Sequence, residues 1–350
     1  MGALAAVRHP ARPDADKLCR MSAIPSSSEQ QALASVAGSV ADSELFIVMN
    51  QGSGKSEKDE VRLVIEQELQ QAGRRHRFVP VEPGQIVQAC QEAARQAKDV
   101  GGIIVGAGGD GTINCAAQAA FANDCPLGII AQGTFNLFAR DLGLPLDPAE
   151  ATRMLLRARP EPVQVGLANE RIFLVNASVG LYPKLLADRE EVKSRLGRRR
   201  WIAMLAALKS LMEWRLQLVL DAEMDGELAR LRTASLFLGN NKVQLSRLGI
   251  QDYVVQQVGE GRIACLLVPP MRWWSKLRMI AAAAFGTMGD ERQVQSFPMR
   301  SLTVSARNAR RLKVATDGEV QWMQLPLRFT VAPRPLQVML PAPEERLPPK

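Results

Sequence analysis

Apolar and polar positions follow two different patterns along the 350-residue chain. From about residue 44, short apolar runs alternate with longer amphipathic stretches, and Pro160 and Pro162 close this section. The predicted strands are 45–49, 77–81, 101–105 and 127–131, and the predicted helices are 56–72, 84–98, 112–123 and 148–158. Such an alternation predicts a parallel sheet with helices on both faces.

After about residue 163 the apolar runs are short and are bounded by Gly, Asn, Asp and Pro, which is typical of antiparallel strands. The predicted strands are 163–167, 171–175, 215–221, 232–239, 262–268, 300–305, 311–316 and 326–331. We therefore expect an α/β domain over 44–162 and a β-rich domain over 163–336. A flexible tail is predicted over 1–43, and a C-terminal segment over 337–350 is predicted to be mobile after about 341.

The most informative segment is the glycine-rich turn Gly108–Asn114, GGDGTIN, between a predicted strand and a predicted helix. Glycines allow close approach of a ligand, and a helix N-terminus favours negative charge, so this turn predicts a phosphate site. Asp110 lies inside the turn. Its carboxylate would repel phosphates unless a divalent cation or a ribose hydroxyl offset its charge, which indicates metal–nucleotide chemistry. The alternative is a turn that only joins strand to helix.

Two common phosphate motifs overlap with these segments, and neither is complete. The spacing Gly106-x-Gly108-x-x-Gly111 satisfies the dinucleotide fingerprint, which expects an acidic residue after the next strand. That strand is followed instead by Gln132, Gly133 and Thr134. Residues 52–56 read GSGKS, like the end of a P-loop, but the first glycine of that motif would fall on Met49.

Three further segments stand out along the chain, in this order: residues 50–54 (NQGSG), residues 133–140 (GTFNLFAR) and residues 317–319 (DGE). Together with GGDGT they resemble the diacylglycerol kinase catalytic family, in the bacterial branch that is also similar to sphingosine kinases, over roughly 44–340. GGDGT alone is shared with NAD kinases and phosphofructokinase-like folds. The resemblance implies an N-terminal α/β domain of that type and a C-terminal antiparallel β-sandwich. It also implies that the last strand returns to the first domain and that the site lies between the two domains.

The resemblance implies a lipid kinase that uses ATP and Mg²⁺ to phosphorylate a hydroxyl of a diacylglycerol-like or other long-chain lipid. Glu319 would be the general base, with Asp317 nearby and Asp110 as a catalytic carboxylate that also binds the metal ion. Asp-Gly-Glu is also an ordinary hairpin turn. The residues expected at the nucleotide are Asn50, Gly52, Ser53, Gly54, Gly108, Gly109, Gly111, Thr112, Gly133, Thr134 and Asn136.

The chain departs from the family pattern at Gln51, where Pro is usual, at Cys115, where Glu is usual, and at Leu137, where Asp is frequent. That Asp is an active-site residue in characterised members. Without it, the cation or the acceptor hydroxyl has one acidic partner fewer. A soluble NAD kinase-like enzyme and a non-catalytic lipid- or nucleotide-binding protein remain the alternatives.

The composition of the chain limits the classes of binding partner and of site that it can have. A net charge of +8 favours anionic partners, but basic residues are not interleaved with stacking aromatics, which argues against nucleic acid. With two histidines in the chain, His9 and His76, histidine triads and His-ligated zinc are close to excluded. The five cysteines show no C-x-x-C spacing, which favours reduced, mostly buried thiols of a cytosolic protein.

No uninterrupted run of about 18 apolar residues and no signal-peptide segment are visible. The stretches 193–212 and 270–285 combine Arg or Lys and Trp with apolar residues, which suits an anionic membrane interface. Alternatively, each packs its apolar face on the sandwich. With a lipid substrate, we expect a cytoplasmic protein bound peripherally to the inner face of the membrane. A homodimer is compatible with the sequence, which does not fix the oligomeric state.

Overall fold

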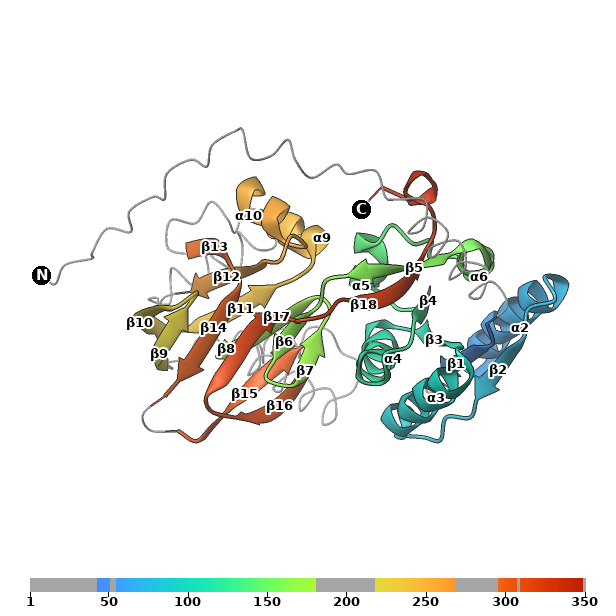
Figure 1. Cartoon of the computed structure of the whole chain (residues 1–350), viewed down its shortest axis with the longest axis horizontal. Helices are drawn as coiled ribbons and strands as arrows, with labels where there is room; N and C mark the ends of the chain where they lie inside the picture. Colours follow the sequence, from blue (N-terminus) through green and yellow to red (C-terminus); the bar gives the residue numbers. More distant parts are fainter. Residues whose placement is uncertain (1–42, 51–54, 181–217, 269–294, 307–308, 349–350) are drawn as a thin grey trace, which may run out of the picture. The chain divides into compact units, whose positions relative to one another are not determined.

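Three six-stranded sheets make up the described part of the chain. The computed structural model describes residues 43–50, 55–180, 218–268, 295–306 and 309–348, which are coloured in Figure 1. All of these residues belong to one structural unit, Ala41–Lys350. The predicted tail up to residue 42 and the stretches 193–212 and 270–285 lie outside the described residues.

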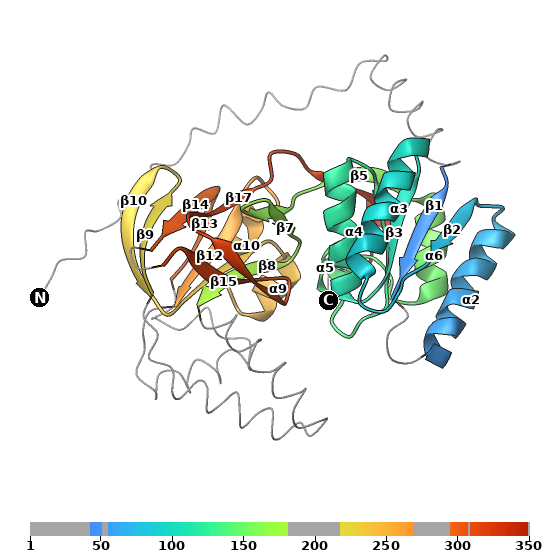
Figure 2. The same cartoon turned by 90° about the horizontal axis from the view of Figure 1, so that it is seen from below.

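The first sheet combines strands from the N-terminal part of the chain with one late strand. Its strands and helices are β1 (Leu45–Met49), α2 (Lys55–Gln71), β2 (His76–Val79), α3 (Ile86–Val100), β3 (Ile103–Gly108), α4 (Asp110–Asn123), β4 (Leu127–Ala131), α5 (Leu137–Asp141), α6 (Pro148–Arg157), β5 (Arg159–Val163) and β18 (Leu336–Leu340). The strand order is β2-β1-β3-β4-β18-β5, and all neighbours are parallel except β18 and β5. Helices α3 and α4 pack together on one face, and α2 and α6 pack together on the other (Figure 2).

Local sequence accounts for these elements. β4 is buried along its whole length and β3 along nearly all of it, as expected for strands covered on both faces. α3 ends where Gly101 adopts a φ of 64°, which glycine tolerates. α6 begins at Pro148, after Asp147 accepts a hydrogen bond from the N–H of Glu150. α3 faces the sheet with a stripe of small side chains, namely Ala89, Cys90, Ala93, Ala94 and Ala97.

The other two sheets form an antiparallel sandwich. Its strands are β6 (Gly166–Ala168), β7 (Arg171–Phe173), β8 (Asn176–Gly180), β9 (Leu218–Met224), β10 (Glu227–Thr233), β11 (Ser235–Gly239), β12 (Ile263–Val268), β13 (Gln295–Met299), β14 (Ser301–Ser305), β15 (Arg311–Thr316), β16 (Glu319–Gln324) and β17 (Leu327–Val331). The sheet orders are β10-β9-β14-β17-β6-β7 and β13-β12-β11-β8-β15-β16. Apolar side chains of both sheets form one core, and the short helices α9 (Lys242–Arg247) and α10 (Asp252–Gln257) cover β11 and β12.

The chain crosses from the first sheet to the sandwich between β5 and β6 and returns between β17 and β18. The two crossings lie side by side, because the N–H of Ala332 donates to the carbonyl of Val165 at 2.9 Å. Arg334, just before β18, donates to the carboxylate of Asp124 and to the carbonyl of Phe121 at the end of α4. The returning strand is therefore fixed to the helix that begins at the glycine turn.

The predicted fold class is confirmed, and the errors are local. Pro160 and Pro162 do not end the section but lie within edge strand β5, paired with β18. The segment after 341 was predicted to be mobile, yet residues 343–345 form a 3₁₀ helix and the N–H of Leu347 donates to Gly143. No strand was predicted at β8, β10, β13 or β16 or over most of β5, and no helix was predicted at α5, α9 or α10. The resemblance implied that the last strand returns to the first domain, and β18 is that strand, although its bounds were not predicted. The domain boundaries stay predictions.

Candidate active site

The glycine turn closes tightly on one side and is open on the other. β3 ends at Gly108 and α4 begins at Asp110. A Cβ atom on Gly108 would lie 2.7 Å from Oγ1 of Thr112, so packing against the first turn of α4 requires glycine there. A Cβ atom on Gly111 would meet no atom within 4 Å. The open side therefore leaves space for a ligand beside the N-terminus of α4.

A second glycine loop, after β4, touches the first. A Cβ atom on Gly133 would lie 2.8 Å from Cα of Gly109 and 2.8 Å from Oδ1 of Asn136. Asn136 has a φ of 50°, and its side-chain amide both accepts from the N–H of Gly133 and donates to its carbonyl, each at 2.8 Å. Asn136 therefore shapes this loop from within, while Thr134 is exposed.

Asp110 joins the two loops. Its carboxylate accepts hydrogen bonds from the N–H groups of Asn136 and Leu137, each at 3.0 Å, at the start of α5. Negative charge at a helix N-terminus is favourable, so the contact stabilises this arrangement of both turns. From the sequence, the Asp110 carboxylate was expected to bind a divalent cation, and its hydrogen bonds to the second glycine loop were not predicted. Leu137, which takes the place of the usual acid, packs against the apolar core.

A cavity of about 460 Å³ adjoins the open side of the glycine turn. It has the size of a small-molecule site. The predicted site residues that line it are Asn50, Gly108, Gly109, Gly111, Thr112 and Glu319, together with Met49, Val61, Ile86, Ala107, Cys115 and Gln132, for which no role was predicted. The predicted residues that do not line it are Asp110, Gly133, Thr134, Asn136 and Asp317, and residues 52–54 lie outside the described part.

The Asp-Gly-Glu segment is a hairpin turn between β15 and β16, with φ values of 48° at Asp317 and 89° at Gly318. The carboxylate of Asp317 points into the protein. It accepts hydrogen bonds from the N–H groups of Leu174, Val175 and Asn176, at 2.8, 2.8 and 2.9 Å, and from the amide of Asn114. Burial raises the pKa of Asp317, and these hydrogen bonds act in the opposite direction.

Glu319 begins β16 and lines the cavity with its side chain 48% exposed. Its carboxylate forms a hydrogen-bonded ion pair with Arg171, which also donates to Oε1 of Gln321 at 3.2 Å. Arg171 comes from β7, at the edge of the opposite sheet of the sandwich. Arg171 was not predicted as a site residue. In the sequence it is a charged residue at the end of a predicted strand, a property that many surface residues share.

Helix α4 connects the two halves of the site. Its N-terminus carries the glycine turn, and two amide side chains one turn apart reach the sandwich. Asn114 donates to Asp317 in the hairpin turn, and Gln118 both accepts from the N–H of Ile172 and donates to its carbonyl. Ile172 follows Arg171 in β7. The position of Glu319 relative to the glycine turn is therefore set by one rigid helix.

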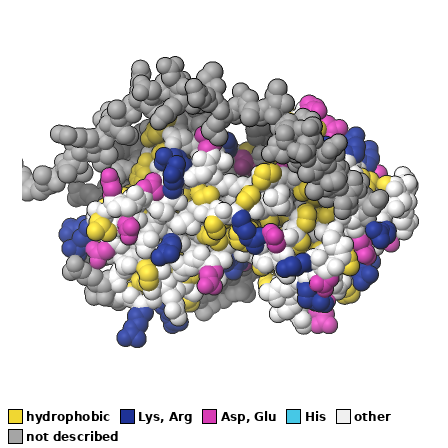
Figure 3. Space-filling view, in the orientation of Figure 1, with side chains coloured by type: hydrophobic (Ala, Val, Ile, Leu, Met, Phe, Trp, Pro, Cys, Tyr) yellow, Lys and Arg dark blue, Asp and Glu magenta, His cyan; other side chains and the backbone are white. Residues whose placement is uncertain are grey.

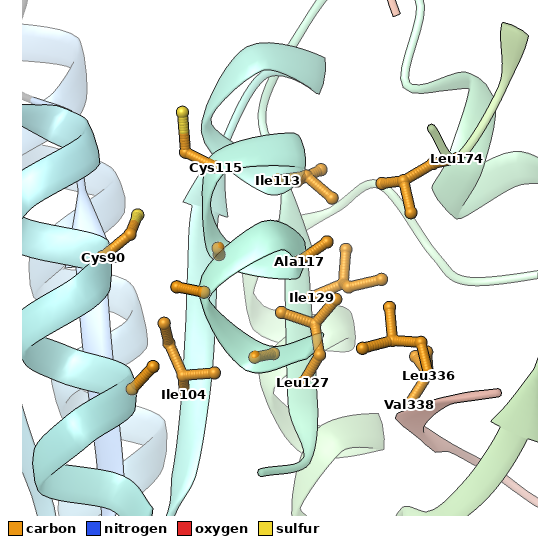
Figure 4. Packing of buried hydrophobic residues seen from close by; sticks show 14 of the residues in the cluster. Cys90, Ile104, Ile113, Cys115, Ala117, Leu127, Ile129, Leu174, Leu336 and Val338 are labelled. Carbon is orange, nitrogen blue, oxygen red and sulfur yellow. The ribbon is translucent and has the colours of Figure 1, made fainter. Parts of the chain in front are cut away.

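The cysteines of the described part are free and buried, as predicted for reduced thiols. Figure 4 shows Cys115 on the side of α4 that faces α3, and Cys90 on α3. Burial raises the pKa of Cys115, nearby Glu319 raises it further, and Arg171 lowers it. Burial raises the pKa of Cys90 to about 12 and that of Cys125 to about 11. Cys115 is therefore a neutral thiol in the cavity wall.

Metal-binding clusters and membrane-spanning helices were also sought among the described residues. In the described part, no three His, Cys, Asp or Glu side chains are grouped so that they could share a metal ion. No helix among the described residues has the length and apolar character needed to cross a membrane.

Comparison with known proteins identifies the segment that carries this site. Residues 44–168 match the family model of the diacylglycerol kinase catalytic domain. This segment belongs to the diacylglycerol kinase catalytic-domain family. The predicted resemblance is thereby confirmed for the part of the catalytic domain that holds both glycine loops. The hairpin with Glu319 lies outside the matched residues.

Individual relatives agree with this family. A "Probable lipid kinase YegS-like" of Serratia proteamaculans is 33% identical over 159 residues, which are 44% of this chain and 50% of that protein. A "Diacylglycerol kinase" of Bacillus subtilis is 36% identical over 118 residues, 33% of this chain and 38% of the relative. This chain thus spans half or less of these two relatives. The crystal structure of a diacylglycerol kinase from Bacillus anthracis matches 87% of this chain and 98% of its own, with a TM-score of 0.63 at 22% identity, which shows a shared fold.

Proposed function

We propose that the protein is an ATP-dependent lipid kinase that phosphorylates a hydroxyl group of a diacylglycerol-like or other long-chain lipid. One observation carries the proposal. Glu319 and four residues of the glycine turn, which are far apart in the sequence, line the same cavity; the four are Gly108, Gly109, Gly111 and Thr112. The family match and the names of the relatives support a kinase, and the acceptor class is our inference from them.

In the proposed reaction, the phosphates of ATP lie on the open side of the turn at Gly111, against the N-terminus of α4. Glu319 accepts the proton of the lipid hydroxyl while the oxygen of that hydroxyl forms a bond to the γ-phosphorus. The bond from that phosphorus to the bridging oxygen breaks, and ADP leaves. Such transfer depends on positioning and on neutralising charge more than on covalent chemistry of the protein. Here α4 provides the positioning.

A Mg²⁺ ion fits this site if the nucleotide brings most of its ligands. Mg²⁺ is commonly held by one or two carboxylates, substrate phosphates and water. Asp110 does not itself line the cavity, but it lies between Gly109 and Gly111, which do. Each oxygen of its carboxylate accepts one hydrogen bond, which leaves further lone pairs for an ion. Bound Mg²⁺ would offset the charge of the phosphates. Asp317 is unsuited to this role because four donors occupy its two oxygens.

The partners follow from this function as proposals. The lipid substrate requires contact with a membrane, and the net charge of +8 favours an anionic one. We propose a peripheral protein at the cytoplasmic face of the membrane, without a nucleic-acid partner.

The test compares two Asp-Gly-Glu hairpins of the same chain. Residues 225–227 have the same sequence as 317–319 and nearly the same φ values, 48° and 92°, but Glu227 is exposed. Purified wild type, Glu319→Gln and Glu227→Gln are incubated with labelled ATP, Mg²⁺ and a panel of lipid alcohols, with NAD as the soluble acceptor. We expect Glu319→Gln to lower turnover by about 10²–10⁴-fold, because general-base catalysis has this magnitude, and to leave nucleotide affinity nearly unchanged.

Each result has one meaning. Phosphorylation of NAD without phosphorylation of any lipid would assign the chain to the soluble kinases. Equal turnover of the Glu319→Gln and Glu227→Gln variants would remove Glu319 from the chemistry. Loss of nucleotide affinity with normal turnover would make Glu319 a nucleotide residue.

A further inference from the structure

The outer face of the β15–β16 hairpin carries two cations around one exposed tryptophan. Trp322 is 56% exposed. The guanidinium carbon of Arg311 lies 5.0 Å from the centre of its ring, and Nζ of Lys313 lies 5.5 Å from it. We call Arg311, Lys313 and Trp322 the hairpin patch. Both cations are themselves exposed.

The strand register creates this patch. Arg311 and Lys313 are two residues apart, so they share a face of β15, and Lys313 pairs directly with Trp322 on β16. The residues that alternate with them, Val314 and Met323, are buried in the core of the sandwich. The patch is therefore a side of the sheet that faces solvent.

The hairpin patch is cationic without neighbouring acids in its own strands. Within residues 309–324 the acids are Asp317, whose carboxylate is hydrogen-bonded inside the protein, and Glu319, which pairs with Arg171. Among described residues, neither Arg311 nor Lys313 has an ion pair. Figure 3 shows cationic side chains projecting from the lower left margin of the visible face.

The β9–β10 hairpin of the opposite sheet provides a contrast. It also exposes an apolar side chain, Leu228, beside two arginines on one strand, Arg230 and Arg232. There, however, the facing strand β9 carries acids: Asp221 is opposite Arg230 and forms an ion pair with it at 3.9 Å, and Glu223 is opposite Leu228. Among the described residues, the outer face of β9–β10 thus carries charges of both signs and the outer face of β15–β16 carries cations, although both expose an apolar residue.

We propose that the hairpin patch docks the protein on an anionic lipid surface, an inference that rests on the proposed lipid kinase function. Tryptophan and long cationic side chains are suited to a bilayer interface, where an apolar body meets acidic head groups. Trp322 lies three residues from Glu319 along β16, a distance of about 10 Å at the rise of a strand. Three residues is an odd spacing, so the two side chains lie on opposite faces of β16, and docking through the patch places the membrane beside the hairpin that carries the proposed general base, on the face away from its carboxylate.

The experiment measures binding to vesicles without nucleotide, so that it does not depend on kinase activity. Vesicles of phosphatidylcholine alone and of equal parts phosphatidylcholine and phosphatidylglycerol are sedimented with the protein at low and high salt. The variants are Arg311→Glu with Lys313→Glu, and Trp322→Gln. The matched controls lie on the β9–β10 hairpin. Arg230→Glu with Arg232→Glu changes the net charge by the same amount as the double reversal, and Leu228→Gln replaces an exposed apolar side chain by Gln, as Trp322→Gln does. Thermal unfolding verifies that each variant folds.

We expect the Arg311/Lys313 reversal to weaken binding to the anionic vesicles by about tenfold or more, since each basic side chain contributes severalfold at low salt. Trp322→Gln should weaken binding to the same vesicles, and both controls should bind like the wild type. Where a charge reversal fails to fold, the Gln variants of both cations replace it. Equal binding of patch and control variants would overturn the proposal. Patch-dependent binding to a single-stranded oligonucleotide without vesicle binding would also overturn it, in favour of nucleic acid.

The two proposals fail separately. Patch-dependent vesicle binding without phosphorylation of any lipid would refute the kinase function and leave the docking surface. Phosphorylation of lipids in detergent by a protein whose patch variants bind vesicles normally would refute the docking surface alone.

Discussion

Replacing Asp317 by Asn should destabilise the fold, and the structure gives the size of the effect. One carboxylate oxygen of Asp317 accepts from the N–H groups of Val175 and Asn176, and the other accepts from the N–H of Leu174 and the amide of Asn114. Asn keeps one oxygen and can retain the first two bonds. Its new amide group faces the other two donors.

Rotation of the Asn114 amide relieves half of this conflict. Oδ1 of Asn114 is buried and accepts no hydrogen bond, so it can accept one from the new amide. The N–H of Leu174 then remains unpaired, which costs about 1–3 kcal/mol of the free energy of unfolding. Asp317→Ala leaves all four donors unpaired and should cost about 4 kcal/mol or more. Total stabilities of about 5–15 kcal/mol make that variant a severe one.

The chain supplies a matched control in Asp225, the first residue of the other Asp-Gly-Glu hairpin. Its φ is also 48°, so the backbone conformation that favours Asp or Asn is the same. Asp225 is exposed, and one oxygen accepts from the N–H groups of Arg300 and Ser301. Asn can retain that oxygen, so Asp225→Asn should change stability by less than about 0.5 kcal/mol. Urea unfolding gives both values, provided that the slopes agree.

Equal stabilities of the Asp317→Asn and Asp225→Asn variants would refute the hydrogen-bond argument. If Asp317→Asn kept its stability but lost turnover, Asp317 would act in the chemistry, as the sequence analysis predicts. A loss of stability with turnover preserved in the folded fraction would make Asp317 a residue that positions the hairpin.

Two glycines of the turns and the buried cysteines give three further predictions. Gly111→Ala should leave the free energy of unfolding unchanged or raise it by about 0.5–1 kcal/mol, because the new Cβ meets open space in a helix, and yet weaken ATP binding measured by calorimetry. Gly133→Ala should instead lower thermal stability, since its Cβ would lie 2.8 Å from Cα of Gly109; the reverse ranking would contradict the packing of the two loops. With Cys19→Ser, the native protein should show no rapidly reacting thiol near pH 8, because the other cysteines are buried with raised pKa values and thiolate is the reactive form. Rapid labelling of the native variant would contradict this, and labelling in urea serves as the control.

The sequence predicted the type and chain order of the elements well where periodicity was strong. It failed where a residue type has two uses. Pro160 and Pro162 resemble a linker, but they are two residues apart, so their missing N–H groups lie on one side of β5. That side is the free edge of the sheet, where no hydrogen bond is lost. Nothing in the local sequence shows that β18 will pair with the other side.

The candidate site shows the same limit. Asp-Gly-Glu occurs twice, at 225–227 and 317–319, and both form the turn that this sequence favours. What distinguishes the second copy is its docking against α4, which local sequence does not encode. Arg171 and Gln118 were missed for this reason, since their roles arise from contacts between distant strands and helices.

The position of β18 has a consequence for how the chain matures. A ribosome delivers residues 44–163 first, then the whole sandwich, and only afterwards the strand that belongs between β4 and β5. During synthesis, the apolar edge of β4 therefore stays unpaired while the sandwich emerges and folds. The matched segment 44–168 is a unit of sequence similarity, but it lacks an interior strand of its own sheet. The N-terminal part of this protein thus becomes a complete structure only after the whole sandwich has been synthesised.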